Sequence, residues 1–98
     1  MFYRPVMDGI TATQRMRRVL LVLLTDAANI SGLTIVRTAG LSVWATWTCL
    51  DQLEDRAWIT GEFEDGPYPR RRLYRLTPNG WTYAHLLLGL DRSEVRRG

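Results

Sequence analysis

Arginine side chains gather in the segment at residues 69–80, which reads PRRRLYRLTPNG. Three of them are consecutive: Arg70, Arg71 and Arg72. A guanidinium group binds phosphate and carboxylate oxygens through several N–H donors at once. Thr77 is a favoured N-cap and Pro78 suits the first helical position, so a strand here is expected to pass directly into a helix. The arginines therefore lie in a hairpin strand, where they can meet an anionic partner.

Other residue types that carry chemistry are few and separated. The single cysteine, Cys49, and the single histidine, His85, fall in different apolar helical segments. They cannot complete a zinc site, and they form neither a disulfide nor a nucleophile–base pair. Asp51 and Asp55 are spaced i, i+4, which is typical of a solvated helix face. The sequence therefore predicts no enzyme, no metal site and no cofactor, and a protein of the reducing cytoplasm.

The chain has 98 residues and a net charge of +3, with 13 Arg and no Lys. This length suits one domain, residues 1–98, with a single core. Residues 1–50 carry five Arg and two Asp, residues 51–66 one Arg and six acids, and residues 67–98 seven Arg and two acids. An acidic band thus separates two basic ends. No apolar run approaches the ~20 residues that span a bilayer, so no membrane association is expected.

Hydrophobic spacing predicts four helices and one hairpin. From residue 13, apolar residues recur at helical spacing: Met16, Val19, Leu20, Leu23, Leu24 and Ala27. Leu21 and Val22 widen this face, which fits either a central core helix or one that also contacts a partner chain. The remaining elements are helices at 33–38, 43–56 and 78–90, and strands at 58–64 and 70–76. Residues 1–12 are expected to form an N-terminal arm, 13–90 the folded core and 91–98 a polar tail.

Capping residues define the order of the middle helices. Ser31 can cap the helix at 33–38, Gly40 lies in the following turn, and Ser42 can cap the helix at 43–56. Two helices joined by a three-residue turn with glycine form a helix-turn-helix, whose second helix reads DNA. With the hairpin, this predicts an α+β fold: a winged helix-turn-helix with a three-helix core, a two-stranded β-hairpin wing and a C-terminal helix.

Two segments, 50–59 (LDQLEDRAWI) and 71–80 (RRLYRLTPNG), resemble those of PadR-type winged-helix transcriptional regulators. The first is similar to the end of the recognition helix running into the wing, and the second to the return strand and start of the last helix. The sequence departs from the family pattern at two positions: Ala57 stands where the family usually has glycine, and Leu73 stands where the family commonly has an aromatic residue. The resemblance implies DNA binding and dimerisation. It also implies that an aromatic effector can bind near the dimer interface, although no residue here supports one.

A helical wheel of residues 43–56 separates core from reading positions. Val43, Thr46, Trp47, Leu50 and Leu53 fall on the predicted core side. The residues expected to face DNA are Ser42, Trp44, Ala45, Thr48 and Gln52, with Gln52 as a reader of adenine. A solvated helix face is the alternative. Asp51 and Asp55 would repel phosphates, whereas Glu54 lies nearer the core and is expected to pair with an arginine.

Backbone contacts to DNA are expected from the wing arginines Arg70, Arg71 and Arg72 and, near the start of the first helix, from Arg17 and Arg18 together with Arg15. Cations at a helix N-terminus oppose its macrodipole, so an anion is expected nearby, either a phosphate or a protein carboxylate. The expected homodimer interface is on the last helix: Trp81, His85, Leu86, Leu87 and Leu90. The first helix is an alternative surface.

These residues favour a small dimeric DNA-binding transcriptional regulator, acting as a repressor that occludes a promoter. The alternative is a winged helix that binds proteins without reading DNA, supported by the acidic band and by Trp44.

Overall fold

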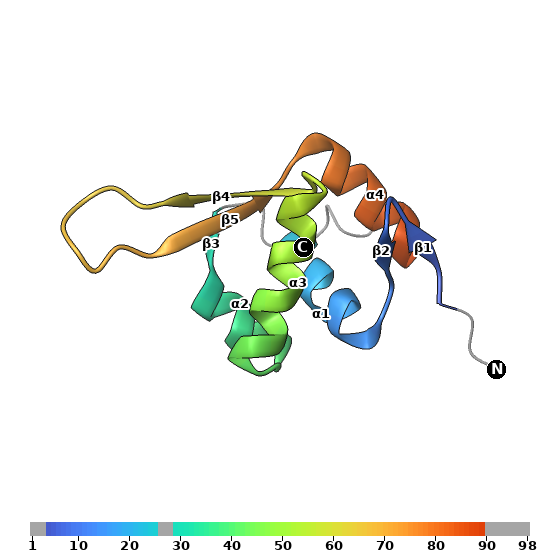
Figure 1. The fold of residues 1–98 in the computed structure, drawn as a ribbon, viewed down its shortest axis with the longest axis horizontal. Helices are drawn as coiled ribbons and strands as arrows, with labels where there is room; N and C mark the ends of the chain where they lie inside the picture. The colour runs from blue at the N-terminus through green and yellow to red at the C-terminus, as the bar shows by residue number, and fades with distance from the viewer. Residues whose placement is uncertain (1–3, 26–28, 90–98) are drawn as a thin grey trace.

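The computed structural model describes residues 4–25 and 29–89. Its elements are, in chain order, β1 (Val6–Met7), β2 (Ile10–Thr11), α1 (Gln14–Thr25), β3 (Ile30–Ser31), α2 (Gly32–Ala39), α3 (Val43–Asp55), β4 (Ile59–Phe63), β5 (Arg72–Leu76) and α4 (Pro78–Leu88). Figure 1 shows α1, α2 and α3 packed together, with the β4–β5 hairpin projecting from one end. The β1–β2 hairpin lies beside α4 at the opposite end. No helix among the described residues is long and apolar enough to cross a membrane.

Helix α1 supplies the centre of the core. Its buried residues are Met16, Val19, Leu20, Val22, Leu23 and Leu24. Leu21 is the exception, because its side chain is 41% exposed. The predicted core helix is therefore confirmed over its described length, and Ala27 lies outside the described residues.

The predicted helix-turn-helix is confirmed. The Ser31 hydroxyl accepts a hydrogen bond from the Thr34 backbone N–H, and the Ser42 hydroxyl accepts one from that of Ala45. Gly40 ends α2 in the left-handed conformation (φ 69°), and its N–H donates to the Val36 carbonyl. Glycine adopts this conformation without strain, so the chain turns sharply into α3.

The wing contains a strand that the sequence did not reveal. Strand β5 pairs with β4 on one side and with the two residues of β3 on the other, giving the order β3–β5–β4. Ile30 pairs with Tyr74 and Ser31 with Leu73, directly before α2 begins. A two-residue strand shows no alternation of polar and apolar residues, and this explains why it was missed. All pairs are antiparallel, and the α+β winged helix-turn-helix is confirmed.

The N-terminal segment is more ordered than the expected arm. Strands β1 and β2 form a hairpin whose turn residues, Asp8 and Gly9, both have positive φ (51° and 78°), as a type I′ turn requires. Ile10 and Ala12 are buried in the core. The Asp8 carboxylate accepts a hydrogen bond from Trp58 Nε1 at 3.0 Å, which fixes the hairpin to the start of the wing.

Trp58 lies where α3, the wing and α4 meet. Its side chain is fully buried, and its carbonyl accepts the Thr77 N–H at 2.9 Å. The Thr77 hydroxyl donates to the Ala57 carbonyl at 2.8 Å and accepts the Gly80 N–H at 3.0 Å as the cap of α4. A Cβ on Gly80 would collide with the Trp58 carbonyl, so only glycine permits this contact. Both ends of the wing are therefore fixed at one point.

Ala57 connects α3 to the wing in the left-handed region, at φ 57°. This conformation costs a residue with a Cβ roughly 1–2 kcal/mol, and glycine avoids the cost. We therefore expect Ala57→Gly to raise the free energy of unfolding by about 1 kcal/mol, since greater freedom in the unfolded chain offsets part of the gain. The melting temperature, followed by circular dichroism, should rise by roughly 4 °C.

Ala45→Gly is the matched control, because Ala45 lies inside α3. Glycine in a helix interior costs roughly 0.5–1 kcal/mol, so this variant should melt at a lower temperature. Destabilisation by Ala57→Gly would contradict the strained conformation at this position.

Candidate nucleic-acid interface

Helix α3 presents an outer face of mixed character. Trp44 is the most exposed of its apolar residues, at 71%, while Gln52 is exposed and Thr48 half-buried. The Thr48 hydroxyl donates to the Trp44 carbonyl at 2.9 Å, so the threonine methyl group and the hydroxyl lone pairs remain for other contacts. Ser42 is exposed, but its hydroxyl already caps α3 through the Ala45 N–H.

Two positions of α3 differ from the helical wheel. Ala45, expected to face DNA, is only 7% exposed because the N-terminal segment and the start of α1 lie against this side of the helix. Val43, expected in the core, is 49% exposed at the first position of α3. Ala45 therefore cannot serve as a principal base contact. The buried positions Thr46, Leu50 and Leu53 agree with the wheel, and Trp47 is partly buried.

The acidic residues of α3 divide into two kinds. Asp51 and Asp55 are exposed, and within the described residues neither forms an ion pair. Glu54 pairs with Arg72 of β5, with 2.8 Å between Oε2 and Nη2, as the sequence predicted for an arginine partner. This hydrogen bond raises the pKa of Arg72 and joins the helix to the wing.

The three wing arginines have different partners. Arg72 also lies over the rings of Phe63 (5.3 Å) and Tyr74 (5.6 Å). A Cβ on Gly61 would lie 2.8 Å from Arg72 Nε, so glycine leaves the space that this guanidinium occupies. Arg70 is exposed, and its guanidinium lies 4.5 Å from the centre of the Tyr68 ring.

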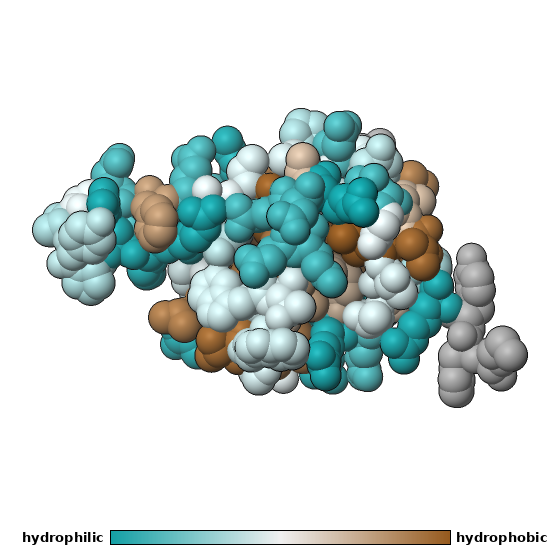
Figure 2. Space-filling model, viewed as in Figure 1, coloured by the Kyte–Doolittle hydropathy of each residue, from teal (hydrophilic) through white to brown (hydrophobic). Residues whose placement is uncertain are grey.

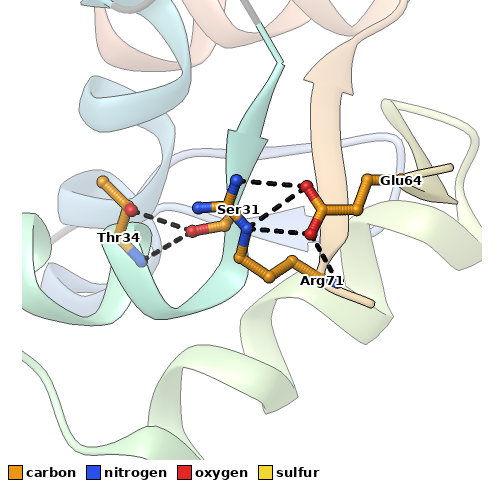
Figure 3. A network of polar contacts seen from close by, with 4 residues as sticks. All are labelled: Ser31, Thr34, Glu64 and Arg71. Atoms are coloured by element: carbon orange, nitrogen blue, oxygen red, sulfur yellow. Dashed lines mark hydrogen bonds and ion pairs between the residues drawn. The ribbon is translucent and has the colours of Figure 1, made fainter. Parts of the chain in front are cut away.

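Arg71 is bound by Glu64 across the wing (Figure 3). Its Nε and Nη2 donate to the carboxylate at 3.1–3.3 Å, and its backbone N–H donates to Oε1 at 3.1 Å. The side-chain bond, followed by the backbone bond, lowers the pKa of Glu64. Arg70 and Arg71 precede β5, which begins at Arg72, because the strand is shorter than the predicted 70–76.

A groove separates α3 from the wing, with a volume of about 1060 Å³; we call it the wing groove. Its lining residues come from the start of α2, from α3 and from both arms of the wing: Ser31, Gly32, Leu33, Trp47, Asp51, Glu54, Asp55, Phe63, Pro69, Arg70, Arg71, Arg72 and Tyr74. In Figure 2, the face that carries α3 is mostly hydrophilic or neutral, with brown apolar patches below the root of the wing and near α4.

A second groove, of about 470 Å³, lies on the other side of α3, where α1 begins; we call it the entry groove. It is lined by Arg4, Thr13, Gln14, Arg15, Ala45, Thr48, Cys49 and Gln52. Arg4 and Arg15 thus lie beside Thr48 and Gln52, two of the residues expected to read bases. Arg4 cannot be assigned to the interface from the sequence alone, because positions far apart in the chain meet only through the packing of the N-terminal segment and α1 against α3.

The arginines predicted from α1 fall on different sides. Arg18 borders a hollow with Thr38 and Ala39 at the end of α2, close to the Gly40 turn. Arg17 is exposed but borders neither this hollow nor either groove. Arg15 is therefore a better candidate for this side of the interface than Arg17.

The single cysteine and the single histidine are both buried. Burial raises the pKa of the Cys49 thiol, with Arg15 acting weakly in the opposite direction. His85 Nδ1 contacts the Trp81 carbonyl at 2.7 Å, and its ring lies 3.9 Å from that of Trp81. Among the described residues, no three His, Cys, Asp or Glu side chains gather into a group that could hold a metal ion.

Two of the residues predicted to form the dimer surface on α4 are buried. His85 and Leu87 are each only 3% exposed, because α4 packs them against the core of its own chain. They cannot form an outer surface. Leu86 is 61% exposed, Trp81 is partly buried, and Leu90 lies outside the described residues.

Comparison with known proteins finds similarity in structure alone. No protein-family model matches the sequence, and no curated protein matches it. The fold is similar to a mutant of ZitR from Lactococcus lactis, with TM-score 0.68, 14% identity, and coverage of 92% of this chain and 60% of that one. It is also similar to a mutant of MepR from S. aureus, with TM-score 0.70, 16% identity, and coverage of 87% and 62%.

A PadR family transcriptional regulator from Eggerthella lenta gives TM-score 0.65 and 21% identity, covering 78% of this chain and 72% of that one. This chain spans about 60% of the length of the ZitR and MepR chains. At these identities the likeness concerns the fold, which is a winged helix.

Proposed function

We propose that this chain binds double-stranded DNA as a transcriptional regulator, with α3 as the recognition helix. One observation carries the proposal. The outer face of α3 lies between two basic flanks, Arg4 and Arg15 at the entry groove and Arg70–Arg72 on the wing. A helix in the major groove has a phosphate backbone on each side, so cations flanking the helix match the arrangement of the charges on DNA.

In this proposal the base contacts come from Trp44, Thr48 and Gln52. All three lie on the accessible side of α3, and Thr48 and Gln52 also line the entry groove. The Gln52 amide can donate to and accept from adenine, and the methyl groups of threonine and thymine can pack together. Ser42, the N-cap of α3, is the remaining residue proposed to lie near the bases.

Affinity comes from phosphate contacts. Arg70, Arg15 and Arg4 form no ion pair within the described residues. Arg71 and Arg72 are already ion-paired with Glu64 and Glu54. To bind phosphate, each must leave its carboxylate or contact both groups at once, and this lowers its net contribution to DNA affinity. A phosphate near Arg15 and Arg18 would also offset the unfavourable position of these cations at the start of α1.

We further propose that two copies form a homodimer and repress transcription by occluding a promoter. Leu86 of α4 and Leu21 of α1 are exposed leucines on neighbouring helices. A two-fold dimer through them would present two recognition helices to successive half-sites. The PadR family transcriptional regulator that shares this fold supports a regulatory role.

A second candidate function is protein binding without DNA recognition. It is favoured by the exposed Trp44 and the unpaired carboxylates Asp51 and Asp55, because α3 carries no basic residue. Trp44→Ala would then release a bound protein, whereas the arginine variants below would have no effect on any binding.

The phosphate contacts predict a distinctive salt dependence. Arg15→Ala and Arg70→Ala should each weaken binding to all duplex sequences, because each removes one sequence-independent contact. The slope of log K against log salt should fall by about 1 for each variant. Fluorescence anisotropy with a pool of random labelled duplexes, titrated from low salt upward, measures both quantities.

Arg17→Ala is the control for total charge, since Arg17 is exposed but borders neither groove. Its salt slope should match that of the unmodified protein. Equal effects from all three substitutions would show that the flanks of α3 have no special role, and an absence of DNA binding at low salt would reject the proposed function.

Sequence preference should depend on Thr48. Thr48→Ala removes the hydroxyl and methyl groups that face the entry groove, so we expect discrimination at one base pair to fall by about 1–3 kcal/mol. Binding to random DNA and the salt slope should stay unchanged. Selection of duplexes from a random library, before and after the substitution, measures this; an identical selected motif would contradict base reading by α3.

Dimerisation should depend on Leu86. Leu86→Arg places a charge on an exposed position of α4, so it should convert the dimer to a monomer without unfolding it. Sedimentation equilibrium gives the mass, and circular dichroism checks the fold. A matched change at another exposed apolar residue, Val6→Arg, should leave the mass unchanged; a monomeric unmodified protein would refute the proposed dimer.

A further inference from the structure

The charge of the entry groove has a single sign. Among the described residues that line this groove, Arg4 and Arg15 are basic and none is acidic. The other lining residues are polar or, in the case of Ala45 and Cys49, buried beneath them. The acidic residues of α3 line the wing groove instead: Asp51, Glu54 and Asp55. Helix α3 therefore separates a groove of mixed charge from one that carries positive charge only.

The two arginines of the entry groove are available to an outside partner. Arg4 and Arg15 are exposed, and neither forms an ion pair within residues 4–25 and 29–89. The charge of Arg15 reaches the floor of the groove, because it opposes the rise in the pKa of the Cys49 thiol that burial causes. Arg71 and Arg72 on the wing, by contrast, already hold carboxylates. The guanidinium donors at the entry groove can therefore bind an external anion.

The position of Arg15 also calls for an anion. It is the second residue of α1, whose first turn contains no acidic residue, so the helix macrodipole opposes its charge. The sequence left phosphate and a protein carboxylate as alternatives for the compensating group. Among the described residues no carboxylate pairs with Arg15, and that of Asp8 is bound to Trp58 Nε1. An anion from outside the chain is the remaining alternative.

We propose that the entry groove binds a sugar phosphate, with its phosphate monoester held by Arg4 and Arg15 and its hydroxyl groups beside Thr48 and Gln52. A phosphate monoester carries a charge of about −1.5 to −2 at pH 7, which matches two guanidinium groups. Each guanidinium can bind two phosphate oxygens through its planar fork of N–H donors. The groove volume of about 470 Å³ lies within the range of about 300–1,000 Å³ that small-molecule pockets occupy.

The polar residues of the groove fit a molecule rich in hydroxyl groups. The Gln52 amide can both donate and accept hydrogen bonds. The Thr48 hydroxyl donates to the Trp44 carbonyl and so offers its lone pairs, whereas the Thr13 hydroxyl accepts the Met16 N–H and still has its own proton to donate. Sugar hydroxyls complement both kinds of group. An apolar ligand would cover these polar groups without pairing them, at a cost in free energy.

The DNA backbone is the other source of phosphate oxygens at this place. Each phosphodiester of the backbone carries one negative charge, so it matches only half of the charge of Arg4 and Arg15. Under the proposed function, the same two arginines contact such a diester. Binding of a free sugar phosphate does not depend on that function, and the two sources can be distinguished by the charge of the ligand.

The test is isothermal titration calorimetry of the full chain without DNA, with ribose 5-phosphate as the probe. Ribose is the neutral comparison, and dimethyl phosphate is a diester with a single charge. We expect ribose 5-phosphate to bind, dimethyl phosphate to bind at least about ten-fold more weakly, and ribose not to bind. Arg4→Ala/Arg15→Ala should weaken binding of ribose 5-phosphate by about ten-fold or more, equivalent to roughly 1.4 kcal/mol.

Two further variants separate a local site from the total charge. Gln52→Glu places a carboxylate beside both arginines without removing either, so it should also weaken binding of ribose 5-phosphate by about ten-fold or more. Arg17→Ala/Arg37→Ala removes two exposed arginines that line neither groove, and its affinity should equal that of the unmodified protein. Circular dichroism checks that each variant is folded. Equal loss in the two double-arginine variants would overturn the proposal.

Backbone amide chemical shifts locate the bound probe. Ribose 5-phosphate should shift the amide signals of Thr13, Thr48 and Gln52, whereas shifts confined to the wing at residues 70–72 would overturn the proposed site. Equal affinity for dimethyl phosphate would also overturn it and would leave the groove as a contact for the DNA backbone. A protein that binds labelled duplex but not ribose 5-phosphate refutes this inference alone. One that binds ribose 5-phosphate but no duplex at any salt concentration refutes the proposed function and leaves the sugar-phosphate site standing.

Discussion

The hydrogen bonds between Thr77 and the Ala57–Trp58 backbone hold the wing in its position relative to α3. Trp58 N–H is bound to the end of α3 through the Leu53 carbonyl, and its own carbonyl is bound to the N–H of Thr77. The entry and exit of the hairpin are thereby joined over the fully buried Trp58 side chain. Asp8 binds the indole from the other side, so the N-terminal hairpin belongs to the same support. The elements on both sides of α3, the wing and the N-terminal hairpin, therefore depend on this junction.

The wing is less positive than its arginines suggest. Glu54 and Glu64 take up two guanidinium groups, and the bound carboxylates are exposed enough for salt and solvent to weaken the pairs. These contacts order the wing, and in the proposed function they lower its affinity for phosphate. In the proposed function, sequence specificity therefore depends more on α3, and long-range attraction to DNA depends on the unpaired arginines Arg4, Arg15 and Arg70.

Much of the fold was predictable because its signals are local. Ser31, Ser42 and Thr77 cap helices as expected, and Gly40 ends α2 as expected. The Asp8–Gly9 pair of the N-terminal hairpin is also a local signal, because Asp-Gly favours a type I′ turn. The site was less predictable, because the two grooves are formed by side chains distant in sequence. The approach of Arg15 to Gln52 and the burial of Ala45 both depend on how α1 packs against α3.

The absence of a side chain at Gly61 constrains which residues can occupy positions 54, 61 and 72 together. Arg72 lies across the wing only because no side chain occupies position 61, and its charge is balanced by Glu54 on a different element. A larger residue at 61 would displace the guanidinium and leave Glu54 without its partner. Natural variation at these three positions must therefore be correlated, so lineages that lose the glycine should also lose the ion pair.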